Sequence, residues 1–309
     1  MNLEAFILGT GGMMPLPHRF LTSVLLRREG ELFLFDCGEA TQISLKKLNL
    51  KWKKITSIFI SHTHADHVTG LPGILMLSSQ VDRDEPLYIY GPPKIKEYIE
   101  ASRRTLDMYI NYEIIVREIS EDGVCYEGDG FKISAFKLEH TKTCYGYVLQ
   151  EDERPGIFYP EKAEELNVPK GPLWSVLQRG ESVELEDGSI VKPEDVMGIA
   201  RSGRKFTFVT DTLYLEKISK WAANSDLMIC EGMFKHELKE DAFEKKHMTS
   251  VQAATCAADA GGVKRMGLIH YSPRYIEPDL RAMLKEAREI FPATFLSRDG
   301  QTLSIPNVD

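Results

Sequence analysis

Three of the chain's eight histidines and one aspartate lie within six consecutive positions of SHTHADHVTG, residues 61–70. The apolar run ITSIFI comes directly before, so the cluster begins where a strand is expected to end. His62 and His64 are two positions apart and can point the same way from an extended segment, whereas Asp66 and His67 begin the next turn. Clusters of His and Asp at such spacing are typical of metal sites. The spacing favours two metal centres, because two cations about 3.5 to 4 Å apart can share a bridging water and lower its pKa.

Three further residues of the same chemical kind end expected strands elsewhere in the chain. His140 ends FKISAFKLEH, Asp211 ends KFTFVTD and His270 ends MGLIH. Taken singly, a His or Asp at such a position is more often a turn or cap residue. Loops at strand ends also carry many binding and catalytic residues. The three positions are therefore candidates for the ligands that a pair of metal ions would still need.

The elements that would position these residues are alternating strands and helices. Expected strands cover residues 3–9, 23–28, 32–38, 57–62, 87–91, 112–119, 131–140, 146–150, 205–212, 226–232 and 266–272. Expected helices, with apolar residues three and four positions apart, cover residues 39–50, 93–106, 249–260 and 278–291. Strands and helices in both halves of the chain predict an α/β fold of stacked sheets covered by helices.

Residues 155–200 differ from the rest of the chain. They contain five of its 15 prolines, many charged residues and little apolar periodicity. Such a composition is typical of a surface insertion. We therefore predict a single domain over residues 1–309 with an inserted, flexible and protruding arm over residues 155–200.

Composition limits the classes of protein to consider. The chain has 309 residues, of which 43% are hydrophobic, so it can bury a large core. Its formal charge of −8 argues against a generally basic surface but leaves room for a local nucleic-acid patch. We expect no membrane span and no secretion signal, and hence a cytoplasmic protein. Its five scattered cysteines form no CxxC pair and are expected to be reduced.

HxHxDH followed at long intervals by His, Asp and His resembles the metallo-β-lactamase superfamily. Within it, the details are similar to the ribonuclease Z family of tRNA 3′-end endonucleases. The similar segments are GTGG near the start, DCGEATQ (36–42), SHTHADHVTGLPGIL (61–75), YGPPKI (90–95), HMTSVQAA (247–254) and LNVPKGPLWSVLQRGESVELEDG (166–188). The last segment lies in the arm and resembles the family's tRNA-binding exosite. The resemblance implies an αβ/βα sandwich of two mixed sheets flanked by helices, with a protruding arm.

The resemblance also implies which residues hold the metal ions. One ion is held by His62, His64 and His140, the other by Asp66, His67 and His270, and Asp211 bridges the two. The implied ions are two Zn²⁺ per chain. Carboxylates in the ligand set would also suit Mn²⁺.

Three residues have implied roles in catalysis. Asp66 would orient or deprotonate the attacking water, His247 would assist protonation of the departing oxygen, and Glu231 would support His247. Glu231 is retained although CEGM replaces the family's usual His-Glu-Ala-Thr. His247 could also be an ordinary residue at a helix start. The implied reaction removes the 3′ trailer from precursor tRNA and leaves a tRNA 3′-hydroxyl and a 5′-phosphorylated trailer.

The implied partners are precursor tRNA and a second copy of the chain, with the arm of one subunit reaching the tRNA in the other's active site. Lys170, Arg179, Arg201, Arg204 and Lys205 are candidate phosphate contacts. Acidic residues outnumber basic ones in this part of the chain, so a solvated loop explains these charges equally well.

Other functions stay open at this point. The same ligands would serve another phosphodiesterase, or an arylsulfatase-like hydrolase, acting on a small ester. A non-catalytic RNA-binding or metal-binding module is disfavoured because every ligand position is filled. A thiolesterase or lactonase is disfavoured because a small substrate does not require a long arm.

Overall fold

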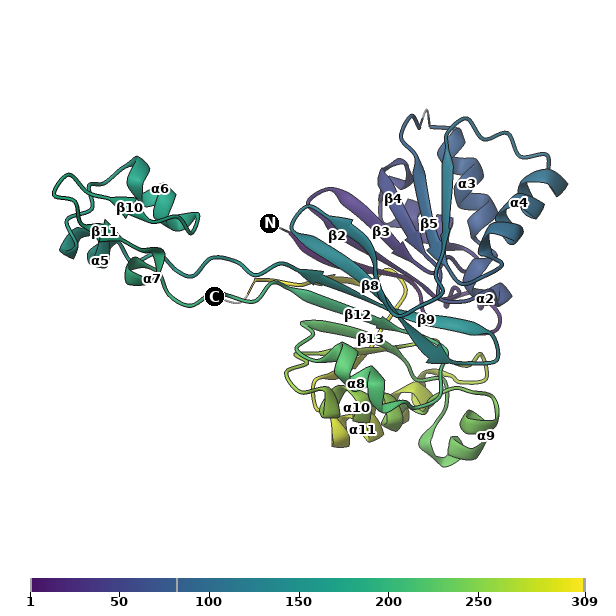
Figure 1. The fold of residues 1–309 in the computed structure, drawn as a ribbon. Helices are drawn as coiled ribbons and strands as arrows, with labels where there is room; N and C mark the ends of the chain where they lie inside the picture. The colour runs from purple at the N-terminus through teal and green to yellow at the C-terminus, as the bar shows by residue number, and fades with distance from the viewer. Residues whose placement is uncertain (1, 82, 308–309) are drawn as a thin grey trace. The chain divides into compact units, whose positions relative to one another are not determined.

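The structure is a computed structural model that describes residues 2–81 and 83–307. Within these residues, two seven-stranded sheets form one compact unit, and Gln150–Arg204 belong to a second (Figure 1). The predicted fold of two mixed sheets flanked by helices is confirmed. None of the described helices has the length and apolar character needed to cross a membrane.

The first sheet is built mostly from the N-terminal half. Its strands in spatial order are β16 (Thr302–Ser304), β1 (Leu3–Gly9), β2 (Ser23–Arg28), β3 (Glu31–Phe35), β4 (Ile55–Phe59), β5 (Leu87–Gly91) and β6 (Ile114–Glu118). Strands β3 to β6 are parallel, so their C-terminal ends lie at one edge. The connections between them contain α1 (Thr41–Lys47), the 3₁₀ turn η1 (Trp52–Lys54), α2 (Ala65–Val68), α3 (Leu71–Ser79) and α4 (Ile95–Thr105).

The second sheet is built mostly from the C-terminal half. Its strands in spatial order are β15 (Thr294–Leu296), β14 (Met266–Ile269), β13 (Leu227–Glu231), β12 (Lys205–Val209), β9 (Thr143–Glu151), β8 (Phe131–Glu139) and β7 (Gly123–Gly128). Strands β12 to β15 are parallel. The helical connections are α8 (Glu216–Ala222), η2 (His236–Leu238), α9 (Lys239–Glu244), α10 (Ser250–Ala260) and α11 (Glu277–Ile290).

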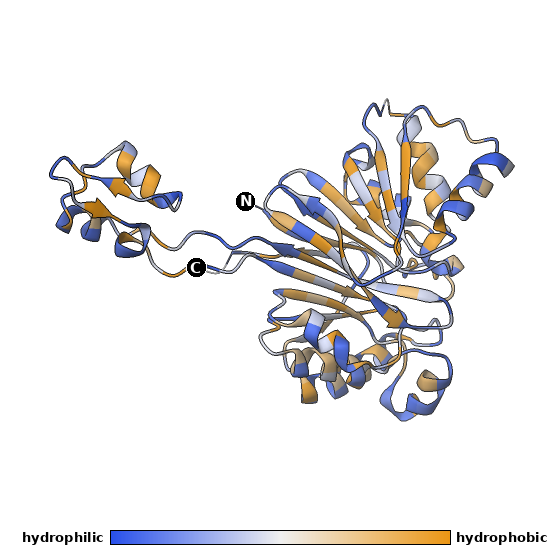
Figure 2. Cartoon of the chain, in the orientation of Figure 1, coloured by the Kyte–Doolittle hydropathy of each residue, from blue (hydrophilic) through white to orange (hydrophobic). Residues whose placement is uncertain are grey.

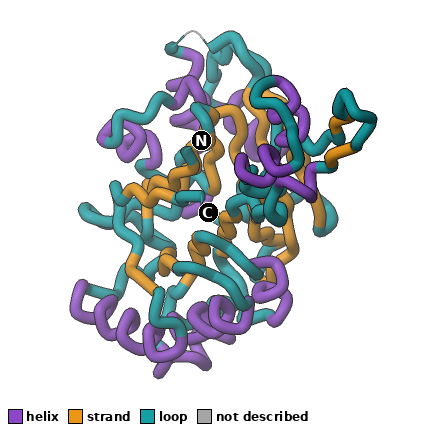
Figure 3. Tube along the Cα trace, turned by 90° about the vertical axis from the view of Figure 1, so that its left-hand side faces the viewer, coloured by secondary structure: helices purple, strands orange, loops and turns teal. Residues whose placement is uncertain are grey.

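Alternation along the strands builds the layers of the sandwich. In β1, Leu3, Ala5 and Ile7 belong to a buried core that also contains residues of the second sheet, whereas Phe6 and Leu8 pack with helices of the first sheet. Successive side chains of a strand point to opposite faces, so an apolar strand can serve both layers. Apolar residues accordingly recur along the strands (Figure 2), and the strands of the two sheets lie between two groups of helices (Figure 3).

The second unit contains the predicted arm and has its own secondary structure. Helices α5 (Pro160–Glu165), α6 (Pro172–Gln178) and α7 (Pro193–Val196) accompany a short hairpin of β10 (Val183–Glu184) and β11 (Ile190–Val191). Its buried apolar residues are Ala163, Val168, Leu177, Val183, Val191 and Val196. Each of the three helices begins at a proline, which is the favoured residue at a first helical position. The prolines that indicated a loop in the sequence therefore start helices.

The sequence also missed elements of the first unit. Helix α3 was not predicted, because its sequence LPGILMLSS is apolar on most sides and has no polar stripe. Strands β7, β15 and β16 were missed as well, and the latter two have only three residues each. The expected helix over residues 39–50 is shorter in the structure, where α1 covers Thr41–Lys47.

Candidate metal centre

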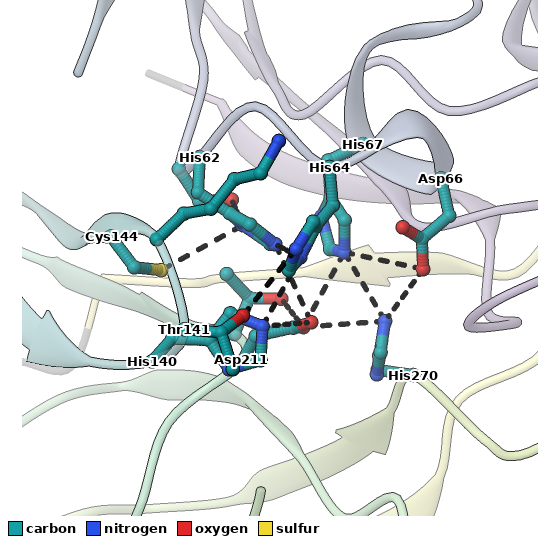
Figure 4. A network of polar contacts seen from close by, with 12 residues as sticks. His62, His64, Asp66, His67, His140, Thr141, Cys144, Asp211 and His270 are labelled. Atoms are coloured by element: carbon teal, nitrogen blue, oxygen red, sulfur yellow. Dashed lines mark hydrogen bonds and ion pairs between the residues drawn. The ribbon is translucent and has the colours of Figure 1, made fainter. Parts of the chain in front are cut away.

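The ends of strands from both sheets meet at one group of histidines and aspartates (Figure 4). His62 lies shortly after β4, His140 follows β8, Asp211 lies shortly after β12 and His270 follows β14. The turn from His62 into α2 adds the remaining residues of the HxHxDH motif. The structure thus brings all seven predicted ligands together.

Four ligand atoms form the first group. His64 Nδ1 lies 2.9 Å from His62 Nε2 and 3.2 Å from His140 Nε2. Asp211 Oδ2 lies 3.5 Å from His62 Nε2 and 3.6 Å from His140 Nε2. Three imidazole nitrogens and a carboxylate oxygen at this spacing suit a tetrahedral cation. His64 presents Nδ1 to the group, whereas the other two histidines present Nε2.

A second group lies next to the first. His270 Nε2 is 3.2 Å from His67 Nε2 and 3.3 Å from Asp66 Oδ2. His67 Nε2 is 3.6 Å from the same oxygen of Asp66. Asp66, His67 and His270 therefore present three ligand atoms to one point.

Asp211 joins the two groups through its two oxygens. Oδ2 faces His62 and His140, whereas Oδ1 lies 3.4 Å from His67 Nε2 and 3.2 Å from His270 Nε2. The Asp211 side chain is only 3% exposed, so its position is fixed by packing. This arrangement places one carboxylate oxygen in each group and fits a bridge between two cations.

Asp36 orients ligands of both groups through hydrogen bonds. His67 Nδ1 donates to Asp36 Oδ2 at 2.7 Å, and Ser61 Oγ donates to the same oxygen at 2.8 Å. Ser61 Oγ in turn lies 3.0 Å from His62 Nδ1. A ligating histidine whose other ring nitrogen donates a hydrogen bond has a fixed tautomer and ring orientation. Asp36 lies in the DCGEATQ segment, but the sequence alone indicates no role for it or for Ser61.

Backbone groups hold two other ligands. His140 Nδ1 lies 2.9 Å from the carbonyl oxygen of Lys246, and the backbone N–H of Met13 donates to Asp66 Oδ2 at 2.7 Å. Neither contact could be predicted from a side-chain pattern, because a residue of any type can supply a backbone group.

The charges of the site match what a cation needs. Burial opposes ionisation of Asp211, but the imidazoles of His270 and His67 lower its pKa well below the ordinary value. Burial, followed by the neighbouring His140, lowers the pKa of His64 to about 4. Burial would also lower the pKa of His67, but the Asp211 and Asp36 carboxylates raise it well above normal. Ionised carboxylates and neutral histidines are the forms that bind metal, and a divalent cation would take the place of a proton held among the carboxylates.

His247 lies beside the metal ligands and is supported by Glu231. Its Nδ1 is 3.2 Å from Glu231 Oε1, and its Nε2 is 4.0 Å from Asp211 Oδ2. The backbone N–H of Thr212 also donates to Glu231 Oε1, at 2.7 Å, which fixes the buried carboxylate. Burial disfavours protonation of His247, but the carboxylates of Glu231 and Asp211 together outweigh it and raise the pKa of His247 to about 9. His247 therefore offers a proton near the metal ligands at neutral pH.

The site opens into a cavity of about 680 Å³. Lys245 and Arg274 line its wall and lie over the ring of Phe234, 5.8 and 5.4 Å from its centroid. Both cationic side chains are exposed. The cavity can thus admit an anionic group to the metal ligands.

The five predicted phosphate contacts have different surroundings. The exposed Lys170 and Arg179 pair with Glu164 at 2.7 Å and Glu181 at 3.3 Å. Arg204 is buried and its guanidinium binds the Glu151 carboxylate at 2.7 Å, which argues against a role in phosphate binding. In the same way, Lys205 Nζ donates to the Ala223 carbonyl at 2.7 Å. The Arg201 Nε–H donates to the Pro155 carbonyl oxygen at 3.1 Å.

Comparison with known proteins identifies one family model for half of the chain and named relatives for nearly all of it. A family model described as "Anti-Pycsar protein Apyc1" matches residues 3–160, about half of the chain, so the chain also falls in that family over this range. Ribonuclease Z of Treponema denticola is 63% identical over 309 residues, which cover 100% of both chains. Ribonuclease Z of Treponema pallidum is 64% identical over 299 residues, covering 97% of this chain and 96% of the relative. The chain belongs to the ribonuclease Z family.

A solved relative agrees with this assignment. Human tRNase Z, short form, superposes with a TM-score of 0.71 at 26% identity, covering 98% of this chain and 99% of the human one. The resemblance to ribonuclease Z seen in the motifs is thereby confirmed. Two of the seven ligand positions, Asp211 and His270, lie beyond the range of the Apyc1 family model.

Proposed function

We propose that this member of the ribonuclease Z family is the metal-dependent endoribonuclease that removes the 3′ trailer from precursor tRNA. The observation that carries the proposal is the group of seven ligands around Asp211 in a chain that matches ribonuclease Z over its full length. Such a substrate would place the reaction in the cytoplasm. The products would be a tRNA with a 3′-hydroxyl and a trailer with a 5′-phosphate.

The proposed cofactors are two Zn²⁺ per chain. The first group offers three imidazoles and one carboxylate oxygen, a set that zinc prefers, whereas the second has a larger share of carboxylate that would also accept Mn²⁺. When bound, two such ions would lower the pKa of a shared water and stabilise charge on the phosphate. Elemental analysis of zinc-replete protein should find close to two ions per chain.

The residues of the chain divide the proton transfers between them. Asp66 exposes 12% of its side chain, against 3% for Asp211, so it is the carboxylate of the two better able to accept a proton from an attacking water. His247 carries the proton that the departing 3′-oxygen needs, and Glu231 keeps that imidazole protonated and oriented. Asp66 and His247 would thus act as base and acid of the same reaction.

We also propose that the protein works as a homodimer. Three apolar side chains that are exposed in the single chain support this: Met76 on α3 is 41% exposed, and Leu106 and Tyr109 beyond α4 are 57% and 82% exposed. Ser79 donates to the Tyr109 carbonyl oxygen at 2.9 Å, so these residues belong to neighbouring segments. Sedimentation should find a dimer, and a fully active monomer would contradict the proposal.

The deciding experiment is cleavage of a precursor tRNA that carries a 3′ trailer, with both new ends mapped. We expect a single cut after the discriminator nucleotide, a 3′-hydroxyl and a 5′-phosphate. Hydrolysis of a bis-aryl phosphate without cleavage of the precursor would show instead a phosphodiesterase that acts on small esters.

A further inference from the structure

A basic segment that the metal centre does not use runs from the last turn of α1 to the start of β4. The chain has no acidic residue between Glu39 and Asp66, and residues 46–54, KKLNLKWKK, hold five lysines around Trp52. In a chain with a net charge of −8, such a segment is the kind of local patch through which a polyanion can bind.

The fold gathers this segment into a compact surface. After α1 the chain reverses at Asn49, which adopts a left-handed conformation with φ of 53°, and the Leu50 N–H donates to the Leu45 carbonyl at 2.9 Å. Asn tolerates this conformation better than most residues. Leu50 is buried, and the partly buried Trp52 packs against the same core. The lysines on either side of Trp52 point away from this core and are exposed.

A cavity of about 300 Å³ lies among these lysines. It is lined by Lys46, Asn49, Leu50, Lys51, Trp52, Lys53 and Val81. None of these residues is acidic, and no ion pair is found between its three lysines and any carboxylate of residues 2–81 and 83–307. We call this surface the lysine pocket.

A neighbouring cavity differs in charge. It is lined by four cationic residues, Lys51, Lys53, Lys54 and Arg83, but also by the three acidic residues Glu31, Asp84 and Glu85. Those carboxylates offset most of the positive charge there, whereas no acidic residue lines the lysine pocket, so the lysine pocket is the better place for an anion.

The lysine pocket and the metal centre lie at opposite ends of one strand. Lys53 lies two residues before the start of β4, and His62 lies shortly after the end of that strand. Five strand residues span about 17 Å. A molecule in the lysine pocket therefore cannot be the scissile phosphate itself, but it can be a distant part of the same RNA.

We propose that the lysine pocket binds single-stranded RNA, with one base against Trp52 and neighbouring phosphates on Lys46, Lys51 and Lys53. A cavity of about 300 Å³ with an aromatic wall has room for one base, and a base can enter it only when it is free of a helical stack. The lysines supply the phosphate contacts. If the proposed function holds, the single-stranded segment is the 3′ trailer of the precursor.

The first test measures RNA binding without catalysis. The probe is a 12-nucleotide, 5′-phosphorylated RNA of unstructured sequence, bound to the full-length protein at several salt concentrations. The variant K46A/K51A/K53A should bind at least several-fold more weakly, and its slope of log affinity against log salt should be shallower by about 2. The matched control is K132A/K220A/K285A, which removes three exposed lysines from other elements and should bind normally.

Trp52 separates base stacking from charge. Trp52→Phe keeps an aromatic ring and should bind the RNA nearly as well as the unaltered protein, whereas Trp52→Ala should bind more weakly with an unchanged salt slope. Equal weakening in both lysine triple variants would overturn the proposal, and so would a polyglutamate peptide that competes as well as RNA, since the pocket would then take acidic protein segments.

The second test uses two precursor tRNAs with trailers of 2 and 20 nucleotides. K46A/K51A/K53A should raise KM for the long-trailer precursor several-fold and leave KM for the short-trailer precursor unchanged. Equal effects on both precursors would assign the pocket to the tRNA body and refute the trailer assignment. Absence of cleavage by the unaltered protein would refute the proposed function alone, because the oligonucleotide test does not depend on it.

Discussion

Asp66 is the single residue whose charge we expect to matter most for turnover. Asp66→Asn keeps the shape of the side chain and its contact with the Met13 N–H, but removes the negative charge that accepts a proton and binds metal. We expect cleavage of precursor tRNA to fall by a factor of about 10² to 10⁴. RNA binding, measured by filter retention, should persist. Unchanged turnover would exclude a catalytic role for Asp66.

Asp36 should control metal binding without touching a metal ion. Asp36→Asn weakens the acceptor for His67 Nδ1–H and for the Ser61 hydroxyl, so ligands of both groups lose orientation. Loss of such a partner typically lowers metal affinity 10- to 100-fold. Competition with a chelator would measure the change. Asp226→Asn is the control: it alters another buried aspartate, paired with Lys264 away from the site, and should keep full metal affinity.

Glu231 should set the pH dependence of cleavage through His247. Burial lowers the pKa of His247, but the carboxylates of Glu231 and Asp211 together more than offset this and raise it to about 9. In Glu231→Gln the pKa should fall, so the proton donor is lost as pH rises through a lower value. The alkaline limb of the pH–rate profile should therefore move to lower pH. A variant that is slower by the same factor at every pH would show that Glu231 acts in folding only.

The residue types of the site could be predicted from sequence, but its contacts could not. His62, His64 and Asp66 stood out because three histidines and an aspartate share six positions. The contact of Asp36 with His67 joins residues 31 positions apart, and only the pairing of β3 with β4 brings them together. The use of Nδ1 by His64 depends on a side-chain rotamer, which spacing along a chain does not determine.

At the scale of elements, strand ends were the informative feature. Asp211 and His270 could be singled out because each ends a short apolar run, and parallel strands bring such ends to one edge of a sheet. The small helices of the second unit were missed, since helices of four to seven residues show too few turns for periodicity to appear.

The loop after β1 should be as important to the second ligand group as the ligands themselves. The Gly12 N–H donates to the Tyr271 carbonyl at 3.1 Å, so this loop runs against the His270 ring. A Cβ at Gly12 would lie 2.5 Å from His270 Cε1, and a ring cannot yield as a flexible chain end does. Gly12→Ala should therefore displace His270 and lower metal content towards one ion per chain.

Gly73→Ala is the control for this substitution. Its Cβ would lie 3.3 Å from the amide nitrogen of Gln42, the mobile end of a side chain, and the residue lies within α3. We expect normal metal content and unchanged or slightly higher stability, because alanine favours a helix over glycine. If Gly12→Ala also retains two ions, the close approach of the loop has no role in metal binding.

At the scale of the whole molecule, the chain is two units with separate cores. The buried valines and leucine of the second unit contact one another and belong to none of the clusters of the first unit. The chain enters and leaves the second unit side by side: the Arg154 N–H donates to the Arg201 carbonyl at 2.7 Å, and Phe158 pairs with Met197. A unit of this kind can be removed where its entering and leaving segments pair, without exposing the core of the first unit.

Replacing residues 160–196 by a short Gly-Ser turn should test what the second unit contributes. The replacement removes the whole small core and joins the chain next to the Phe158–Met197 pair. Binding energy gained far from the reacting phosphate acts only on substrates large enough to reach it. Hydrolysis of a bis-aryl phosphate should stay near its original rate. Cleavage of precursor tRNA should weaken sharply, mainly through poorer binding with a shallower salt dependence.

A charge variant in the intact unit completes this test. Lys170→Ala with Arg179→Ala keeps the small core, since both side chains are exposed, and removes two candidate phosphate contacts. It should weaken precursor binding less than the deletion does and reduce the salt slope by one to two. If the deletion lowers hydrolysis of both substrates together, the unit supports the fold of the first unit. If it lowers neither, tRNA recognition has to reside in the first unit alone.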